Sequence, residues 1–165
     1  MNAGRETNLV LDRLDGLSPW AFTGLLYLAR WAIVVPIGYA LGQMDASGKA
    51  AFDAPAITLF FSFVFLWPLL ETVIECAIPY WLMRKMRGIA IGGRSWGFVV
   101  VSAGIMALLH VDAWPAALLP SLVTGGFLAY TYAHFAASRV GMAMLHTWAF
   151  HAAINIVGWV LIFVF

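Results

Sequence analysis

The amino-acid sequence predicts an all-α membrane protein, a polytopic bundle of about five transmembrane helices. Of its 165 residues, 63% are hydrophobic and only 10% are charged, whereas soluble domains carry about 25% charged residues. Long apolar runs alternate with short polar or glycine-rich connections, and none shows the alternating pattern of a membrane β-strand. The length and the lack of internal repeats predict a single transmembrane domain over residues 1–165.

Each predicted helix begins and ends at a change in composition. The helices are expected at about 19–41, 55–83, 95–111, 118–137 and 142–165. Ser18-Pro19 and Asp53-Ala54-Pro55 are start signals, since each offers a capping side chain followed by a proline. Pro68 and Pro79 lie inside the second helix, so we expect that helix to bend or tilt.

Basic residues predict the orientation of the helices. With the N-terminus in the cytoplasm, one side of the membrane receives nearly all of them, as the positive-inside rule requires. These are Arg5, Arg13, Arg84, Lys85, Arg87, Arg94 and Arg139, and only Lys49 falls on the other side. The first residues lack the features of a cleavable signal peptide. We therefore expect an N-in/C-out protein in the lipid bilayer, and the net charge of +1 gives no indication of a nucleic-acid partner.

Six polar side chains fall near the middle of the predicted spans. They are Arg30, Glu71, Glu75, His110, His151 and Asn155. At 1.5 Å per residue, each lies roughly 12–21 Å from the cytoplasmic end of its helix, inside a hydrocarbon core about 30 Å thick. A charged side chain at that depth costs about 2.5–3.5 kcal/mol. We therefore expect these side chains to face one functional site.

Three other residues are expected to have structural roles. By the same count, His134 and His146 lie within roughly 8 Å of the cytoplasmic edge, where a histidine is easily accommodated. Cys76 is the single cysteine, so an internal disulfide is excluded. Its place in an apolar run predicts that it packs in the interior.

The spacing of the polar residues favours hydrolytic chemistry. Glu71 and Glu75 are four residues apart, as are His151 and Asn155, so each pair shares a helix face. In a pocket with little water, a glutamate can act as a general base, and a histidine or asparagine can donate hydrogen bonds to an oxyanion. Two histidines and a glutamate could also hold a divalent metal ion. No zinc-binding signature is present, and we predict no cofactor.

Three short segments occur in a characteristic order along the chain. They are Pro68-Leu-Leu-Glu71-Thr72-Val-Ile-Glu75-Cys76, Met106-Ala-Leu-Leu-His110 and His151-Ala-Ala-Ile-Asn155. These segments resemble the motifs of the CPBP intramembrane proteases, named for CAAX-prenyl endopeptidases and bacteriocin-processing proteins and also called the abortive-infection (ABI) family. The family pattern is Glu-Glu-x-x-x-Arg, then Phe-x-x-x-His, then His-x-x-x-Asn or Asp. The similarity covers roughly residues 57–160.

The resemblance implies an endopeptidase in which a glutamate activates water. Glu71 would activate the water, His110 would assist, and His151 and Asn155 would form the oxyanion site. The resemblance also implies a hydrophobic peptide or membrane-protein substrate and, together with the small size of the chain, a place in the inner membrane of a bacterium.

The first segment departs from the family pattern at three positions. Thr72 replaces the second glutamate, Cys76 replaces the arginine, and Glu75 stands where the family has an aromatic residue. We expect Arg30, at a similar depth, to supply the missing cation by pairing with Glu75. The departures favour a second interpretation, a catalytically inactive membrane interaction or immunity protein of the same fold. Buried glutamates and histidines also leave open a small proton-coupled transporter subunit.

Overall fold

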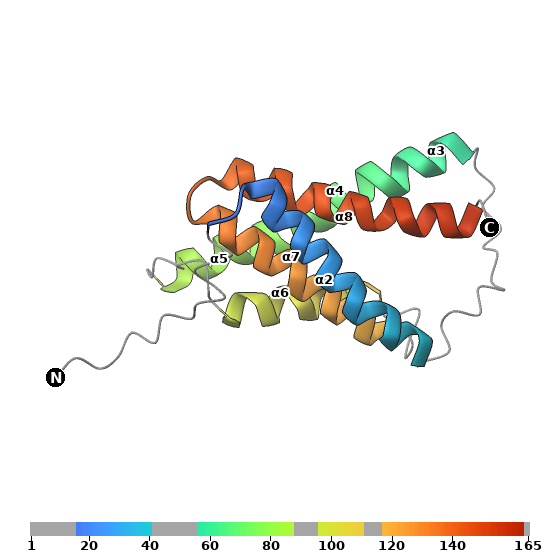
Figure 1. Ribbon diagram of the computed structural model, residues 1–165. Helices are drawn as coiled ribbons and strands as arrows, with labels where there is room; N and C mark the ends of the chain where they lie inside the picture. Colours follow the sequence, from blue (N-terminus) through green and yellow to red (C-terminus); the bar gives the residue numbers. More distant parts are fainter. Residues whose placement is uncertain (1–15, 41–55, 88–95, 111–116, 164–165) are drawn as a thin grey trace.

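The computed structural model describes residues 16–40, 56–87, 96–110 and 117–163, and every regular element in these ranges is a helix (Figure 1). The separate helices are α2 (Pro19–Ala40), α6 (Trp96–Leu109), α7 (Leu118–Ala136) and α8 (Val140–Phe163). A long continuous stretch consists of α3 (Ala56–Phe61), η1 (Ser62–Leu66), α4 (Trp67–Glu71), η2 (Thr72–Ala77) and α5 (Ile78–Arg87). The predicted all-helical class is confirmed.

The predicted start of the first helix is confirmed. α2 begins at Pro19, and Ser18 caps it, because the hydroxyl of Ser18 accepts a hydrogen bond from the backbone nitrogen of Ala21 at 3.3 Å. The backbone carbonyl of Ser18 accepts a further bond from the nitrogen of Phe22. The first bond satisfies a donor of the first turn that has no partner inside the helix, and the second is the first backbone bond of the helix.

Two other boundaries differ from the prediction by two residues or more, and α7 ends at Ala136, one residue before the predicted 137. The long stretch continues to Arg87 rather than ending at 83, so Arg84 and Lys85 belong to α5 and not to a connecting loop. α8 begins at Val140, two residues earlier than expected, after a turn in which Ser138 and Arg139 bond to the carbonyl of Phe135. The predicted boundaries at 41, 55, 95, 111 and 165 lie outside the described residues.

Two π-helical segments, η1 and η2, precede Pro68 and Pro79, the prolines at which a bend or tilt was expected. A proline has no N–H group, so neither residue can bond to the carbonyl four positions earlier, at Val64 and Glu75. Each of these carbonyls belongs to a π-helical segment. A π-helical turn closes over five residues instead of four, and it therefore changes the direction of the side chains that follow.

α7 is the central helix of the bundle. It packs against α2, α6, α8 and η2, and ten of its 19 residues are buried. The approach of α6 is closest at Gly125, where a Cβ atom would lie 2.6 Å from the Cβ of Met106 and 2.9 Å from the Cα of Ala103. Only glycine lets the two backbones come this close.

The outer surface of the bundle is apolar, as expected for a membrane protein. Three stretches are long and apolar enough to cross a membrane, Pro19–Ala40, Ile57–Lys85 and Val140–Leu161, and α6 is apolar but shorter. Large apolar side chains on these helices are exposed, for example Leu28 and Val100. Extensive exposed apolar surface is typical of a protein in contact with lipid. The five-span, N-in/C-out topology stays a prediction.

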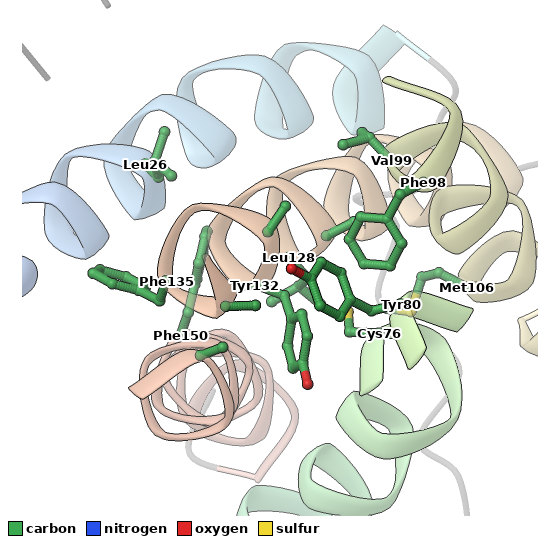
Figure 2. Close-up of a cluster of buried hydrophobic side chains, with 14 of the residues drawn as sticks. Leu26, Cys76, Tyr80, Phe98, Val99, Met106, Leu128, Tyr132, Phe135 and Phe150 are labelled. Atoms are coloured by element: carbon green, nitrogen blue, oxygen red, sulfur yellow. The ribbon is translucent and has the colours of Figure 1, made fainter. Parts of the chain in front are cut away.

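An aromatic core fills the space between α5, α6 and α7. In Figure 2, Tyr80, Phe98 and Tyr132 point toward one another, with Cys76 beside them. The ring centroid of Tyr80 lies 5.4 Å from that of Phe98 and 5.5 Å from that of Tyr132, within the range of favourable aromatic pairs. Cys76 is 1% exposed, which confirms its predicted place in the interior.

His146 was expected near the cytoplasmic edge of its helix, but the side chain is not exposed there. The side chain is fully buried, and its ring lies 4.4 Å from that of Phe135 and 4.2 Å from that of Trp20. Thr23 donates its single hydroxyl hydrogen to the carbonyl of Pro19, so it accepts a bond from His146 Nδ1 at 3.0 Å. His146 is thus a buried link between α2 and α8.

Candidate functional site

One cavity of about 510 Å³ lies between α2, the long helical stretch, α6, α7 and α8. Its polar lining comprises Arg30, Glu71, His110, Ser121, Thr124, His151 and Asn155. In Figure 1, α3 and α8 run together on one side, whereas α2, α6 and α7 run together on the other, and the two groups diverge toward the end that carries Ala40 and Ala56. The cavity therefore joins five of the six polar residues that stand out in the sequence, from helices far apart in the chain.

Glu71 and His151 are in direct contact within this cavity. The Nε2 atom of His151 lies 3.2 Å from Oε2 of Glu71. The side chain of His151 is 3% exposed and that of Glu71 is 20% exposed, so the contact lies where the protein interior meets the cavity. When Glu71 is ionised, Nε2 carries the hydrogen, because two lone pairs would repel each other. His151 thereby orients the carboxylate of Glu71.

His110 presents a hydrogen-bond acceptor to the cavity. Its Nδ1 atom lies 2.9 Å from the backbone carbonyl of Met106, one turn earlier in α6. A carbonyl only accepts hydrogen bonds, so Nδ1 carries the hydrogen and Nε2 has a free lone pair in the neutral ring. His110 and Glu71 line the same cavity. It can therefore accept a hydrogen bond from a water molecule that Glu71 binds.

Asn155 is held by the π-helical segment η1. Its side-chain nitrogen donates a hydrogen bond to the carbonyl of Phe63 at 2.8 Å, and Trp148 donates to the carbonyl of Phe65 at 3.0 Å. The two donors are seven residues apart and lie on one face of α8. The second N–H of Asn155 makes no bond to the described part of the chain. The structure thus fixes the amide while leaving one donor for a ligand.

Arg30 lies at the border of the cavity and is held by two contacts. Its Nε atom donates a hydrogen bond to the hydroxyl of Thr124 at 3.1 Å, and its guanidinium carbon lies 4.1 Å above the ring of Trp31. The residue is only 7% exposed. A hydrogen bond and a cation–π contact together fix the plane of the guanidinium.

The expected pair between Arg30 and Glu75 is not formed. Glu75 is 1% exposed, does not line the cavity, and has no hydrogen-bond partner for either carboxylate oxygen among the described residues. The pairing was expected from the similar depth of the two residues, and depth along a helix does not reveal the face on which a side chain lies. Glu75 belongs to η2 and is buried in the protein interior, whereas the side chain of Glu71 lines the cavity.

Sequence reasoning missed three polar groups that build the site. Ser121 and Thr124 line the cavity from α7, and Trp148 ties α8 to η1. Serine and threonine are common in membrane helices, and a tryptophan in an apolar run resembles ordinary packing. The seven-residue spacing of Trp148 and Asn155 was the one available signal.

The donor set does not favour a metal ion. Within residues 16–40, 56–87, 96–110 and 117–163, no group of three histidine, cysteine, aspartate or glutamate side chains is placed to hold one. The Nε2 atom of His151 faces Glu71, and its Nδ1 atom is buried. The three protein ligands of a catalytic zinc site are therefore not assembled.

The cavity combines groups that can bind both water and a carbonyl. Glu71 and the free nitrogen of His110 are acceptors, and the free N–H of Asn155 is a donor. Acceptors that hold a nucleophilic water beside a donor for the developing oxyanion are the elements of general-base hydrolysis. Comparisons of the chain with known protein families, with curated proteins and with solved structures find no match.

Proposed function

We propose that the protein is an intramembrane endopeptidase that hydrolyses peptide bonds with a water molecule activated by Glu71. The observation that carries this proposal is the contact between Glu71 and His151 in a cavity that His110 and Asn155 also line. The resemblance of these four residues to the CPBP motifs supports it. The proposed substrate is a hydrophobic peptide or a segment of a membrane protein, and the proposed location is a bacterial inner membrane.

In the proposed reaction Glu71 transfers one proton. The carboxylate accepts it from water while the water oxygen bonds to the peptide carbonyl carbon, and His110 Nε2 accepts the hydrogen bond of the other water hydrogen. The C–N bond of the tetrahedral intermediate then breaks, and Glu71 returns the proton to the leaving amine. The products are a carboxylic acid and an amine, and no covalent bond to the protein forms.

The histidines and the asparagine divide the remaining work. Because the Nε2 hydrogen of His151 faces Glu71, we assign His151 to orienting the carboxylate. Asn155, which keeps one free N–H, donates to the carbonyl oxygen as its negative charge develops. This assignment differs from the sequence expectation, in which His151 shared the oxyanion site.

The test compares the glutamate-to-glutamine substitution at two positions of the same helical stretch, Glu71 and Glu75. The protein is reconstituted in lipid vesicles with a randomised hydrophobic peptide library, and cleavage is followed by mass spectrometry. Glu71→Gln removes the general base and should lower kcat by about 100-fold or more. Glu75→Gln is the matched control, since Glu75 does not line the cavity, and it should cleave at the wild-type rate.

Three outcomes contradict the proposal. Cleavage by Glu71→Gln at the wild-type rate would show that Glu71 is not the general base. The absence of any cleavage by the wild type, with Glu71→Gln less abundant or less stable, would favour the inactive interaction protein. Proton flux into vesicles that depends on Glu71, without cleavage, would favour the transporter subunit.

A further inference from the structure

Most hydrogen-bond donors at the cavity are already engaged. The Nε2 hydrogen of His151 faces Glu71, and the Nδ1 hydrogen of His110 is donated to its own helix. Asn155 donates one of its two N–H groups to the carbonyl of Phe63 in η1. The tetrahedral oxygen of a peptide intermediate carries a full negative charge, and the remaining N–H of Asn155 and the hydroxyl of Ser121 are neutral donors, which match it weakly.

Arg30 supplies the donors that the other residues lack. Its Nε atom is bonded to Thr124, but neither terminal nitrogen bonds to a described residue, and Nη1 is fully buried. No carboxylate in the described part of the chain lies within ion-pair distance of Arg30. The guanidinium is therefore a buried cation, fixed in direction, whose charge these residues do not neutralise.

The positive charge of Arg30 lies in the same cavity as the groups proposed to react. Arg30 lines the same cavity as His151, the residue in contact with Glu71. A buried cation in a membrane protein is costly and marks a functional site by default. Because Arg30 is only 7% exposed, its attraction for a developing negative charge is stronger than it would be in solution.

We propose that Arg30 is a catalytic residue that stabilises the oxyanion of the tetrahedral intermediate together with Asn155. This inference rests on the proposed peptidase function. When the water oxygen bonds to the carbonyl carbon, the π electrons of the carbonyl move to its oxygen, which accepts a hydrogen bond from Nη2 of Arg30, since Nη1 is fully buried. When the C–N bond breaks, those electrons restore the double bond. Arg30 keeps its protons throughout.

The first experiment separates kcat from KM with the full chain in lipid vesicles. Oxyanion stabilisation acts in the transition state, so Arg30→Gln should lower kcat by roughly 100- to 1,000-fold with little change in KM. Arg30→Lys keeps a charge without the fixed planar fork, and it should recover part of the lost rate. Arg84→Gln is the control for loss of an arginine, because Arg84 is exposed on α5, and its kinetics should match the wild type.

The second experiment needs only the wild-type protein, so it decides the matter even if the Arg30 variants do not fold. It compares two tetrahedral peptide analogues of one sequence, an anionic phosphinate and a neutral hydroxyethylene. A cation at the oxyanion position predicts that the phosphinate binds more tightly, by at least about 10-fold. Equal binding, or tighter binding of the neutral analogue, would overturn the proposal.

The kinetic outcomes distinguish the role of Arg30 from the function itself. Cleavage by the wild type with an unchanged kcat in Arg30→Gln refutes only the role of Arg30. A raised KM with an unchanged kcat would show that Arg30 binds a negative group of the substrate in its ground state, and would overturn the proposal too. The absence of cleavage by the wild type refutes the peptidase function.

Discussion

Gly125→Ala tests the close packing of α6 against α7, on which the position of His110 depends. The added Cβ would lie 2.6 Å from the Cβ of Met106 and 2.9 Å from the Cα of Ala103. Carbon atoms pack at about 3.5–4.0 Å, so the two helices would have to separate by roughly 1 Å. Overpacking of this kind costs about 1–3 kcal/mol. The displacement reaches His110 because its ring is bonded to the carbonyl of Met106.

Thermal unfolding in detergent measures the loss of stability, and peptide cleavage measures the effect on the site. A shift of about 1 Å in a catalytic group can lower turnover roughly 100-fold. Gly126→Ala is the control, since its Cβ would have no neighbour within 4 Å. Alanine is more favourable than glycine inside a helix by about 0.5–1 kcal/mol, so this variant should be at least as stable as the wild type. Equal stability and turnover in Gly125→Ala and Gly126→Ala would refute the packing argument.

Two further substitutions test the polar contacts that hold α8 in place. Trp148→Phe keeps a large ring but removes the donor to the carbonyl of Phe65, and it should lower the free energy of unfolding by about 1 kcal/mol; an unchanged unfolding curve would contradict that bond. Thr23→Val keeps the side-chain shape but leaves the buried Nδ1–H of His146 without an acceptor, at a cost of about 1–3 kcal/mol. Thr131→Val, which removes only a bond within α7, should cost less, and the reverse order would contradict the link between α2 and α8.

The fold class and most of the cavity were predictable from the sequence, for one physical reason. An ionisable side chain in an apolar run is expensive to place in a bilayer, so each such residue stands out and is expected to face a polar site. Arg30, Glu71, His110 and His151 are of this kind, and all of them line the cavity. Asn155 followed from its spacing to His151.

The features that were not predicted depend on backbone geometry and on which helix faces are covered, and neither can be read from the sequence. The spacing of four residues grouped Glu75 with Glu71, but Glu75 is buried in the interior and only Glu71 lines the cavity. The partners of Trp148 and Asn155 are carbonyls of η1, and a backbone acceptor has no side-chain signature. The burial of His146 was missed because depth along a helix does not reveal which face is covered.

Direct attack of a Glu71-activated water on the peptide bond is tested most directly by a single turnover in water labelled with heavy oxygen. Protein in excess over an intact peptide substrate is mixed with the labelled water. The products and the protein are then analysed by mass spectrometry. Direct attack predicts that the first turnover places one labelled oxygen atom in the new carboxyl group of the peptide and none in the protein. An unlabelled peptide product, with the label in Glu71, would show instead that the glutamate forms a covalent bond to the substrate.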